Sequence, residues 1–528
     1  MALVARTPSF VSRCVAALLA VTSAVGAYHL TTPALVASHD EGVYVATAWA
    51  LETSQGYRLI NLPSALPQTK YPPGYPAALA IAGSPAPGAT GDFRPVKRVN
   101  AVCLAVIVFL TGELAARLSG AAMARVIAAL LASSALGLTS FVDIVGSDLL
   151  YMAWLMLAIV SLPATNRAEA RKSWITGAAL AASILTRTAG VAPAVGAMAF
   201  LWRRNRRNAL SVAIAVAMAV TGWITWTALA RAPGAGVLER YYISYDNLAW
   251  TKVLAAPTYV LSVIAANTVS YVRTIPEVFG APGTVLTLTL LLGLMLGARS
   301  CQASPLLSAL AFLMVPYYVQ LLGFEALVAR YLLVGVPLAC AVVGTATTRF
   351  SGAASEVRTT TAWACVALLL VANALELRHY ASLDADAIHV GFGRVLPFRK
   401  SGFLETARWI REHTAQDAVL ASANDTMYFA YTGRRGVRPW PYEPAQYDPH
   451  YHATSAAALS DQVPQDLRRL GVTYLVIDPM LTDLEGQHAA SYMKLIQATG
   501  ADTWTGVFTS DDGLHEVLRR EPRQLPAP

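Results

Sequence analysis

The sequence predicts a polytopic α-helical membrane protein that ends in a small α/β domain. Of its 528 residues, 55% are hydrophobic and only 14% are charged, whereas soluble proteins carry about 25% charged residues. Apolar stretches long enough to cross a bilayer, about 17–25 residues, recur as far as residue 378. Beyond that point helical and strand patterns alternate, which is typical of an α/β domain.

About eleven membrane-spanning helices are expected. Arg187 interrupts the stretch 174–202, which is either one long helix or two short ones. Two are predicted, because Arg187 then lies at a turn. The first stretch also resembles a cleaved signal peptide, but a polytopic chain needs none, so an uncleaved first helix is predicted. The continuous stretches are 11–29, 97–117, 122–141, 148–164, 209–230, 282–298, 304–323, 328–346 and 360–378.

The basic residues fix the expected orientation, because lysine and arginine concentrate in the cytoplasmic loops of membrane proteins. With a cytoplasmic N-terminus, the clusters at 167–172 and 203–207 both fall on the cytoplasmic side. The same count places the long loops 30–96 and 231–281 and the tail 379–528 on the opposite face. The net charge of +8 reflects such loops, and no Arg-rich patch with interleaved aromatic residues indicates nucleic acid as a partner.

Two domains follow from this organisation. Residues 1–378 are expected to form a transmembrane domain, and 379–528 an extracytoplasmic α/β domain. None of the five cysteines lies beyond Cys365, so no disulfide holds the tail, and no His/Cys spacing suggests zinc. In the tail, one helix and two buried strands are predicted, at 402–413, 418–421 and 472–477.

Two adjacent carboxylates, Asp40 and Glu41, follow the first span by about ten residues. Carboxylates at the membrane face are costly to bury without partners. We interpret Asp40 as a general base that activates an acceptor hydroxyl, with Glu41 beside it. The alternative is a helix cap with a solvated charge. His39 next to them suggests either a metal ligand or, more simply, a solvated loop residue.

The same outer loop contains an amphipathic stretch at 44–53 and then Lys70-Tyr71 followed by Pro72, Pro73 and Pro76. The three prolines fix backbone angles, which predicts a rigid turn without regular helix. Lys70 in this turn is either a phosphate ligand or an ordinary surface lysine.

Four further charged residues are candidates. Arg187 is either functional or directed to the interface. Arg330, which precedes Tyr331, either holds a phosphate at head-group level or forms a structural pair with Glu325. Asp143 and Asp148 flank a short outward turn, where capping of the next helix explains Asp148 equally well.

Taken in order, these motifs resemble the GT-C glycosyltransferases. The resemblance is closest to the bacterial branch of lipid A aminoarabinose transferases and lipopolysaccharide-core galacturonosyltransferases, and protein O-mannosyltransferases are more distant. It covers nearly the whole chain. The matching segments are Asp-Glu-x-x-Tyr at 40–44, Lys-Tyr-Pro-Pro-Gly-Tyr-Pro at 70–76, Ser-Asp-Leu-Leu at 147–150, Leu-Thr-Arg-Thr-Ala-Gly at 185–190, Arg-Tyr-Leu-Leu at 330–333 and Ala-Arg-Trp-Ile-Arg-Glu-His at 407–413.

The resemblance implies a multi-pass enzyme of the bacterial inner membrane that uses a polyprenyl-phosphate-linked sugar as donor. Transfer to a cell-envelope acceptor would occur on the outer face with inversion. Asp40 would be the catalytic acid/base residue, and Lys70 and Arg330 would contact the carrier phosphate, with Tyr71, Arg187 and Tyr331 nearby. Thr69 stands where aminoarabinose transferases carry an acidic residue, which favours a different sugar.

An activated lipid-linked sugar needs no nucleotide site, and the sequence has no Walker-type or Rossmann glycine motif. No cofactor is therefore predicted, and a divalent cation is left open. A transporter or flippase of lipid-linked glycans is the main alternative, but it should show two related halves, which the sequence lacks. A non-catalytic scaffold would leave the carboxylates at the membrane face unexplained.

Overall fold

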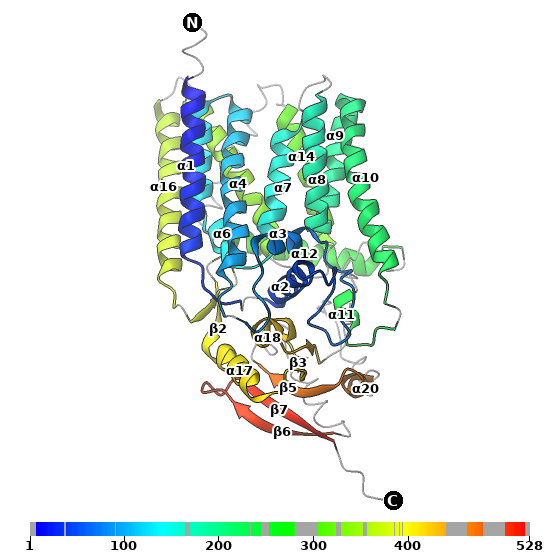
Figure 1. Cartoon of the computed structure of the whole chain (residues 1–528). Coiled ribbons are helices and arrows are strands. Elements are labelled where there is room, and N and C mark those ends of the chain that lie inside the picture. Colours follow the sequence, from blue (N-terminus) through cyan, green and yellow to red (C-terminus); the bar gives the residue numbers. More distant parts are fainter. Residues whose placement is uncertain are drawn as a thin grey trace, which may run out of the picture.

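The protein consists of a helical bundle with a mixed α/β segment below it (Figure 1). In the computed structural model, the described residues are 7–35, 38–89, 91–163, 169–232, 234–243, 253–254, 256–279, 305–323, 329–351, 356–384, 386–389, 391–392, 394–439, 462–478 and 502–522. The helix α1 (Thr7–His29) begins at one end of the bundle, and the described residues of the C-terminal segment, 379–528, lie at the other end. The predicted span at 282–298 lies outside the described residues.

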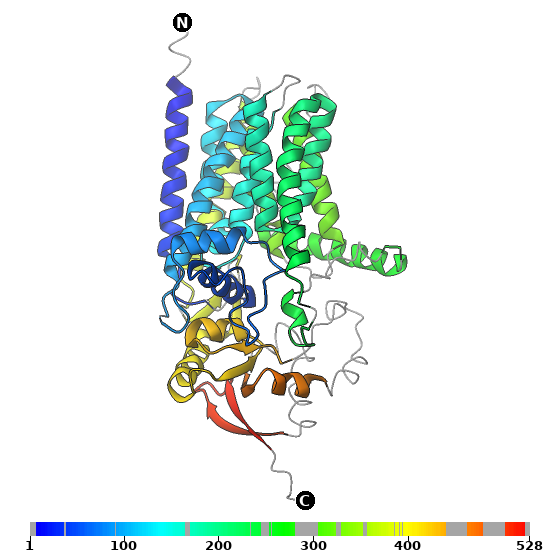
Figure 2. The same cartoon turned by 45° about the vertical axis from the view of Figure 1, so that its right-hand side comes forward.

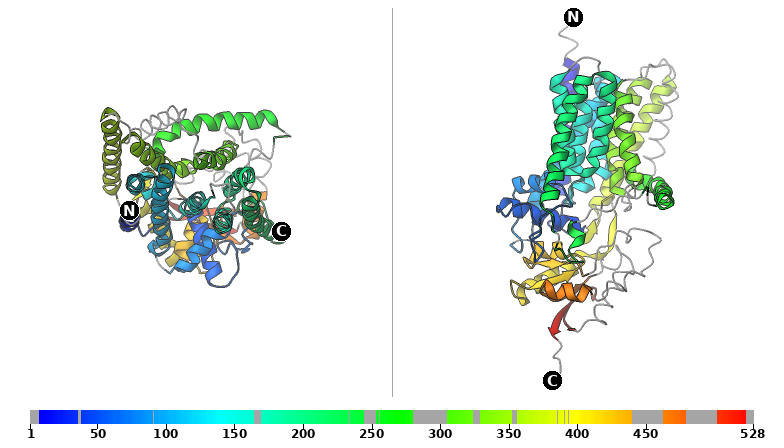
Figure 3. Two further views of the ribbon diagram at one scale, coloured as in Figure 1. Left: turned by 90° about the horizontal axis from the view of Figure 1, so that it is seen from above. Right: turned by 90° about the vertical axis from the view of Figure 1, so that its right-hand side faces the viewer.

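The bundle is built from long apolar helices that run side by side (Figure 3). They are α1 (Thr7–His29), α4 (Arg94–Ser119), α5 (Ala122–Ser134), α7 (Asp148–Ser161), α8 (Ala170–Thr186), α9 (Val191–Arg204), α10 (Arg206–Leu229), α14 (Pro305–Leu322), α15 (Gly335–Ser351) and α16 (Glu356–Ala381), with the short α6 (Leu136–Thr139), η1 (Ser140–Val142), η2 (Thr188–Gly190) and η5 (Ala329–Val334).

Six of the described helices are long and apolar enough to span a membrane, namely α1, α4, α10, α14, η5–α15 and α16. The predicted span 122–141 is instead bent by 60° at Ala135, and counting this bent pair gives up to seven. The chain is thus a polytopic helical membrane protein, while the number eleven stays a prediction. The predicted break at Arg187 is confirmed, because α8 ends at Thr186 and Arg187 is extended.

A layer of shorter helices separates the bundle from the C-terminal segment. It contains α2 (His39–Glu52), α3 (Gly74–Ala82) and α11 (Arg240–Ile243), and the longer α12 (Pro257–Phe279) lies at the same end of the bundle. Figure 2 shows α12 crossing the lower end of the bundle rather than running along it. The prediction that the proline-rich turn contains no regular helix is wrong for its last residues, because α3 begins at Gly74. Pro76 lies in the first turn of α3, where backbone N–H groups lack partners within the helix and proline is tolerated.

The C-terminal segment contains a five-stranded sheet with the order β4-β3-β5-β7-β6. Strands β3, β4 and β5 are parallel, whereas β7 pairs antiparallel with both β5 and β6. The helix and two strands expected near 402–413, 418–421 and 472–477 are present. The elements are β1 (Ala387–His389), β2 (Val395–Arg399), α17 (Lys400–His413), β3 (Val419–Ser422), α18 (Asp425–Thr432), β4 (Gly436–Val437), α20 (Gln462–Arg469), β5 (Val472–Ile477), β6 (Asp502–Thr509) and β7 (Glu516–Pro522).

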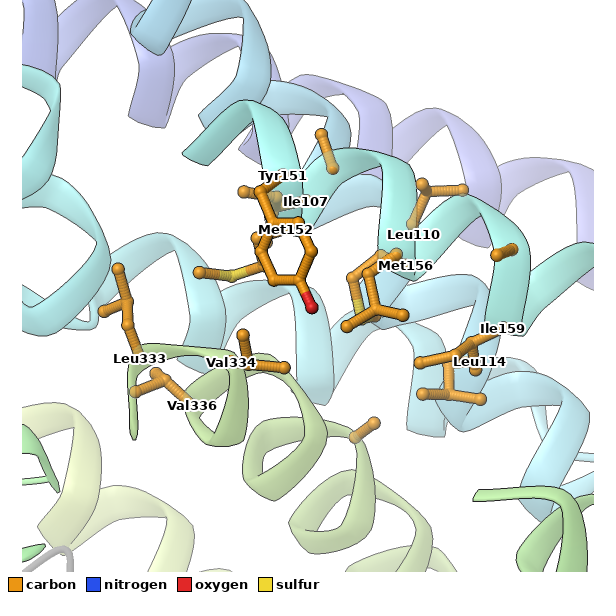
Figure 4. Close-up of a cluster of buried hydrophobic side chains, with 14 of the residues drawn as sticks. Ile107, Leu110, Leu114, Tyr151, Met152, Met156, Ile159, Leu333, Val334 and Val336 are labelled. Atoms are coloured by element: carbon orange, nitrogen blue, oxygen red, sulfur yellow. The ribbon is translucent and has the colours of Figure 1, made fainter. Parts of the chain in front are cut away.

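The largest buried cluster fixes the segment that carries Arg330. In Figure 4, apolar side chains of α4 and α7 pack against Leu333, Val334 and Val336 of η5 and α15. The Tyr317 hydroxyl of α14 also donates a hydrogen bond to the Tyr331 carbonyl oxygen over 3.0 Å. These contacts hold η5 rigidly, so that its first residues are presented to the layer of short helices.

Candidate active site

Asp40 lies in the first turn of α2, which the structure extends back to His39. The helix begins five residues earlier than the amphipathic stretch predicted at 44–53, and its residues from Glu41 to Ala48 are buried. A carboxylate in the first turn is favoured by the unpaired N–H groups there. This position explains how the chain presents Asp40, but it does not explain the partners that Asp40 has.

Two side chains from distant parts of the chain meet the two oxygens of Asp40. The Tyr71 hydroxyl donates a hydrogen bond to Oδ1 over 2.8 Å. Nη2 of Arg330 lies 3.2 Å from Oδ2 and forms an ion pair with it. The side chains of Asp40 and Arg330 remain 18% and 26% exposed, so both are reachable from outside the protein.

The surroundings keep Asp40 ionised. Burial by itself would raise the pKa of this carboxyl, but the positive charge of Arg330 opposes it most strongly. His39, the Tyr71 hydrogen bond and the charge of Lys70 act in the same direction, and together they lower the pKa of Asp40 to about 2. At neutral pH the group is therefore a carboxylate, the form that can accept a proton.

Lys70 is buried beside this carboxylate rather than being a surface lysine. Its Nζ donates a hydrogen bond to the Tyr241 carbonyl oxygen over 3.0 Å and lies 3.9 Å from the centre of the Tyr241 ring. The turn that carries Lys70 packs tightly against the end of α8 at Gly74. A Cβ atom at this position would lie only 2.7 Å from the Leu185 carbonyl oxygen, so only glycine fits there. The proline-rich turn is thus wedged between the start of α2 and the end of α8.

A second ion pair lies on the other side of Arg330. Arg187 pairs with Asp148 at the start of α7 and stands 5.2 Å from the ring centre of Tyr331. Arg330 stands 5.8 Å from the same ring. The Tyr44 hydroxyl and Ser147 Oγ, 3.1 Å apart, join α2 to this end of α7. Most of the predicted residues therefore converge on one site at the junction of the bundle with the short helices.

Glu41 and Asp143 point elsewhere. Glu41 is buried, and its carboxylate accepts the Val145 backbone N–H over 2.8 Å and the Ser38 N–H over 3.4 Å. Asp143 forms a buried pair with Lys97, with Nζ to Oδ1 at 2.7 Å. Each carboxylate ties backbone segments together and is engaged by groups other than those around Asp40.

His39 has a partner that the sequence does not indicate. His39 is not a solvated loop residue, because its side chain is only 9% exposed and its Nε2 lies 2.9 Å from Asp425 Oδ1. Asp425 belongs to α18, and no sequence signal links two residues this far apart. Glu325, the suggested partner of Arg330, lies outside the described residues. Among the described residues, no group of three His, Cys, Asp or Glu side chains could hold a metal ion.

Comparison with solved structures identifies the fold. The structure of ArnT from Cupriavidus metallidurans bound to undecaprenyl phosphate matches 97% of this chain and 99% of its own, with a TM-score of 0.60 and 14% identity. ArnT in the apo state matches with a TM-score of 0.57 and 14% identity, over 100% of both chains. The resemblance to the GT-C glycosyltransferases is therefore confirmed for the fold.

The archaeal oligosaccharyltransferase of Archaeoglobus fulgidus shares this fold as well. Its apo structure matches 98% of this chain and 75% of its own, with a TM-score of 0.56 and 15% identity. The oligosaccharyltransferase AglB from the same organism, in complex with an inhibitory peptide and a dolichol-phosphate, matches 98% of this chain and 75% of its own, with a TM-score of 0.55 and 13% identity. No protein-family model matches the sequence, and no curated protein matches it significantly.

Proposed function

We propose that this protein is a glycosyltransferase that moves a sugar from a polyprenyl-phosphate carrier to a cell-envelope acceptor. The observation that carries the proposal is the ionised Asp40 held between Arg330 and Tyr71, with Lys70 buried beside it. Transfer from a sugar phosphate requires a base for the incoming hydroxyl and cations for the leaving phosphate, and a carboxylate beside cations supplies both. The bound undecaprenyl phosphate and dolichol-phosphate of the two matching proteins support a lipid phosphate as the donor.

The reaction follows from these groups. Asp40 accepts the proton of the acceptor hydroxyl while the oxygen of that hydroxyl forms a bond to the anomeric carbon of the sugar. The bond between that carbon and the phosphate oxygen breaks, and the electron pair leaves with the phosphate. Lys70 and Arg330 stabilise the charge that develops there. Attack opposite the leaving phosphate inverts the anomeric centre and needs no protein nucleophile.

Two anions, the Asp40 carboxylate and the donor phosphate, compete for the guanidinium group of Arg330 in this reaction. A carboxyl group with a pKa of about 2 is a weak base, because proton transfer is most efficient near the operating pH. When the donor phosphate draws the guanidinium of Arg330 toward itself, the field at Asp40 weakens and the pKa of Asp40 rises. Donor binding thus activates the base, which links occupancy of the phosphate site to proton transfer.

The remaining candidates receive supporting roles. Arg187, held by Asp148, adds positive charge near Tyr331, and Tyr71 orients the Asp40 carboxylate. Glu41 anchors α2 to the segment before α7. Because α2 lies at the same end of the bundle as the C-terminal segment, we place both on the outer face of a bacterial inner membrane, with residues 1–378 as the catalytic domain and 379–528 as an extracytoplasmic domain.

The decisive experiment measures transfer from a purified polyprenyl-phosphate sugar to envelope glycolipids by the protein in detergent. Asp40→Asn keeps the size of the side chain but removes its basicity, so turnover should fall by about 10²–10⁴, the usual contribution of a positioned base. Asp384→Asn, whose side chain is 56% exposed, is the matched control. Near-normal turnover of Asp40→Asn with unchanged thermal stability would refute the assignment. A second assay uses the protein reconstituted into vesicles. Movement of the lipid-linked sugar across the bilayer without sugar transfer would indicate a flippase.

A further inference from the structure

The C-terminal segment reaches the first turn of α2 through α18. This helix follows β3 after only two residues, so that its N-terminus lies at the carboxyl edge of the parallel strands. Asp425 is the first residue of α18 and is fully buried. Its placement at a helix N-terminus is favourable for a carboxylate.

Two hydrogen bonds and one close packing contact join α2 to α18, and they lie on both sides of Asp40 in the sequence. Before Asp40, Nε2 of His39 pairs with Asp425 Oδ1 over 2.9 Å, and the Thr426 hydroxyl donates to the His39 carbonyl oxygen over 2.8 Å. After Asp40, Gly42 lies against α18 so closely that a Cβ atom would stand 2.5 Å from the Thr426 carbonyl carbon. The residues that flank Asp40 are thus seated on the C-terminal segment.

The buried carboxylate of Asp425 is itself fixed. Its Oδ2 accepts a hydrogen bond from the buried Asn61 side chain over 3.1 Å, and the Tyr242 hydroxyl is also hydrogen-bonded to it. The ring of His39 packs against Tyr241 with the ring centres 5.5 Å apart. The carbonyl oxygen of Tyr241 accepts the hydrogen bond of Lys70, so Asp425 is connected through His39 both to the neighbouring Asp40 and, by way of Tyr241, to Lys70.

We propose that Asp425 is a positioning residue that acts on Asp40 through His39, so that docking of the C-terminal segment sets the geometry of the catalytic helix. This inference rests on the proposed function, because it takes Asp40 as the base. A base must lie within hydrogen-bond reach of the hydroxyl, and displacement of a reacting group by about 1 Å costs on the order of 10²-fold in rate. The imidazole of His39, one residue before Asp40, transmits such a displacement directly.

A double-mutant cycle separates positioning from general stabilisation. Asp425→Asn removes the charge that holds His39, and we expect kcat to fall about ten- to a hundredfold while the KM for the lipid donor stays within about twofold. In the Asp40→Asn background the same substitution should have no further effect, because no base remains to be positioned. Asp417→Asn, an exposed acid of the same segment, should match the wild type in both backgrounds.

If Asp425→Asn lowers kcat by the same factor in the wild-type and the Asp40→Asn backgrounds, the inference is overturned. A wild-type kcat in Asp425→Asn would also overturn it. If Asp425→Asn does not yield folded protein, His39→Gln replaces it in the cycle. This substitution keeps an N–H donor for Asp425 but removes the imidazole, and the same two outcomes decide. Failure of the proposed function is recognised separately, because Asp40→Asn alone would then retain turnover, and both proposals would fall together.

Discussion

Nη2 of Arg330 lies 3.2 Å from Oδ2 of Asp40, although 290 positions separate the two residues in the chain. The contact joins the start of α2 to η5, which the buried core between α4 and α7 holds in place. The charge of Arg330 lowers the pKa of Asp40 against the effect of burial, and the contact places a cation where a phosphate can compete for it.

The cations are expected to govern use of the donor. Lys70→Ala and Arg330→Ala each remove a charge from the proposed phosphate site. Loss of a hydrogen bond to a charged group costs about 1.5–3 kcal/mol, so the KM for the lipid donor should rise about ten- to a hundredfold. Initial rates over a range of donor concentrations measure this. Arg94→Ala, with a half-exposed side chain, serves as control, and unchanged donor dependence in both variants would count against the phosphate site.

The pH dependence of activity should report the pair of Asp40 with Arg330. A carboxylate with a lowered pKa works above that pKa and fails as pH falls through it, so the wild-type protein should keep Asp40 ionised down to about pH 2. Removing an adjacent arginine raises the pKa of an aspartate by about 1–3 units. In Arg330→Gln, kcat/KM should therefore decline in acid at a pH that is higher by this amount. Superimposable pH profiles would show that Arg330 does not act on Asp40.

Asp143 is expected to matter for stability rather than for chemistry. Asp143→Asn leaves the fully buried ammonium group of Lys97 without its counter-charge. Breaking a buried ion pair costs about 3–5 kcal/mol, so thermal unfolding in detergent should occur at a clearly lower temperature. Turnover per folded molecule should stay close to that of the wild type. A fall of turnover by 10² or more in a protein of normal stability would instead move the catalytic centre towards Asp143.

The orientation in the membrane can be tested with fusions. A reporter that is active only outside the cytoplasm, placed after Pro528, should be active if the C-terminal segment and α2 face outward. A second fusion, truncated at Asn205 between α9 and α10 at the opposite end of the bundle, should be inactive. The reverse pattern would rule out transfer on the outer face and with it the proposed donor.

Local sequence features account for two structural elements around the candidate site. Arg187 breaks an apolar stretch, and the chain breaks there because a guanidinium group is costly inside hydrocarbon. Asp40 follows the first span and lies in the first turn of α2, a position that carboxylates favour, although the sequence predicted a helix only from residue 44. Lys70 and Tyr71 belong to the same outer loop as Asp40, and the structure brings the Tyr71 hydroxyl to Asp40 and buries Lys70 beside it.

The pairing of charges required the tertiary structure. The sequence offers several acids and several arginines at similar depths in the membrane, and their chemistry alone does not choose among the possible pairs. Packing decides that Arg330 meets Asp40, that Arg187 meets Asp148, and that Glu41 turns away to the Val145 backbone. Each choice depends on which helices lie side by side.

The sequence by itself determined the class of protein, the break of the chain at Arg187 and the residues that carry charge at the membrane face, because hydrophobic length and helix-terminal preferences act over short stretches of chain. Only the tertiary structure decided that Asp425, 386 positions after His39, closes the site from the C-terminal segment. A side chain that is solvated in an isolated loop becomes buried when a distant helix packs over it, and no local pattern encodes that contact.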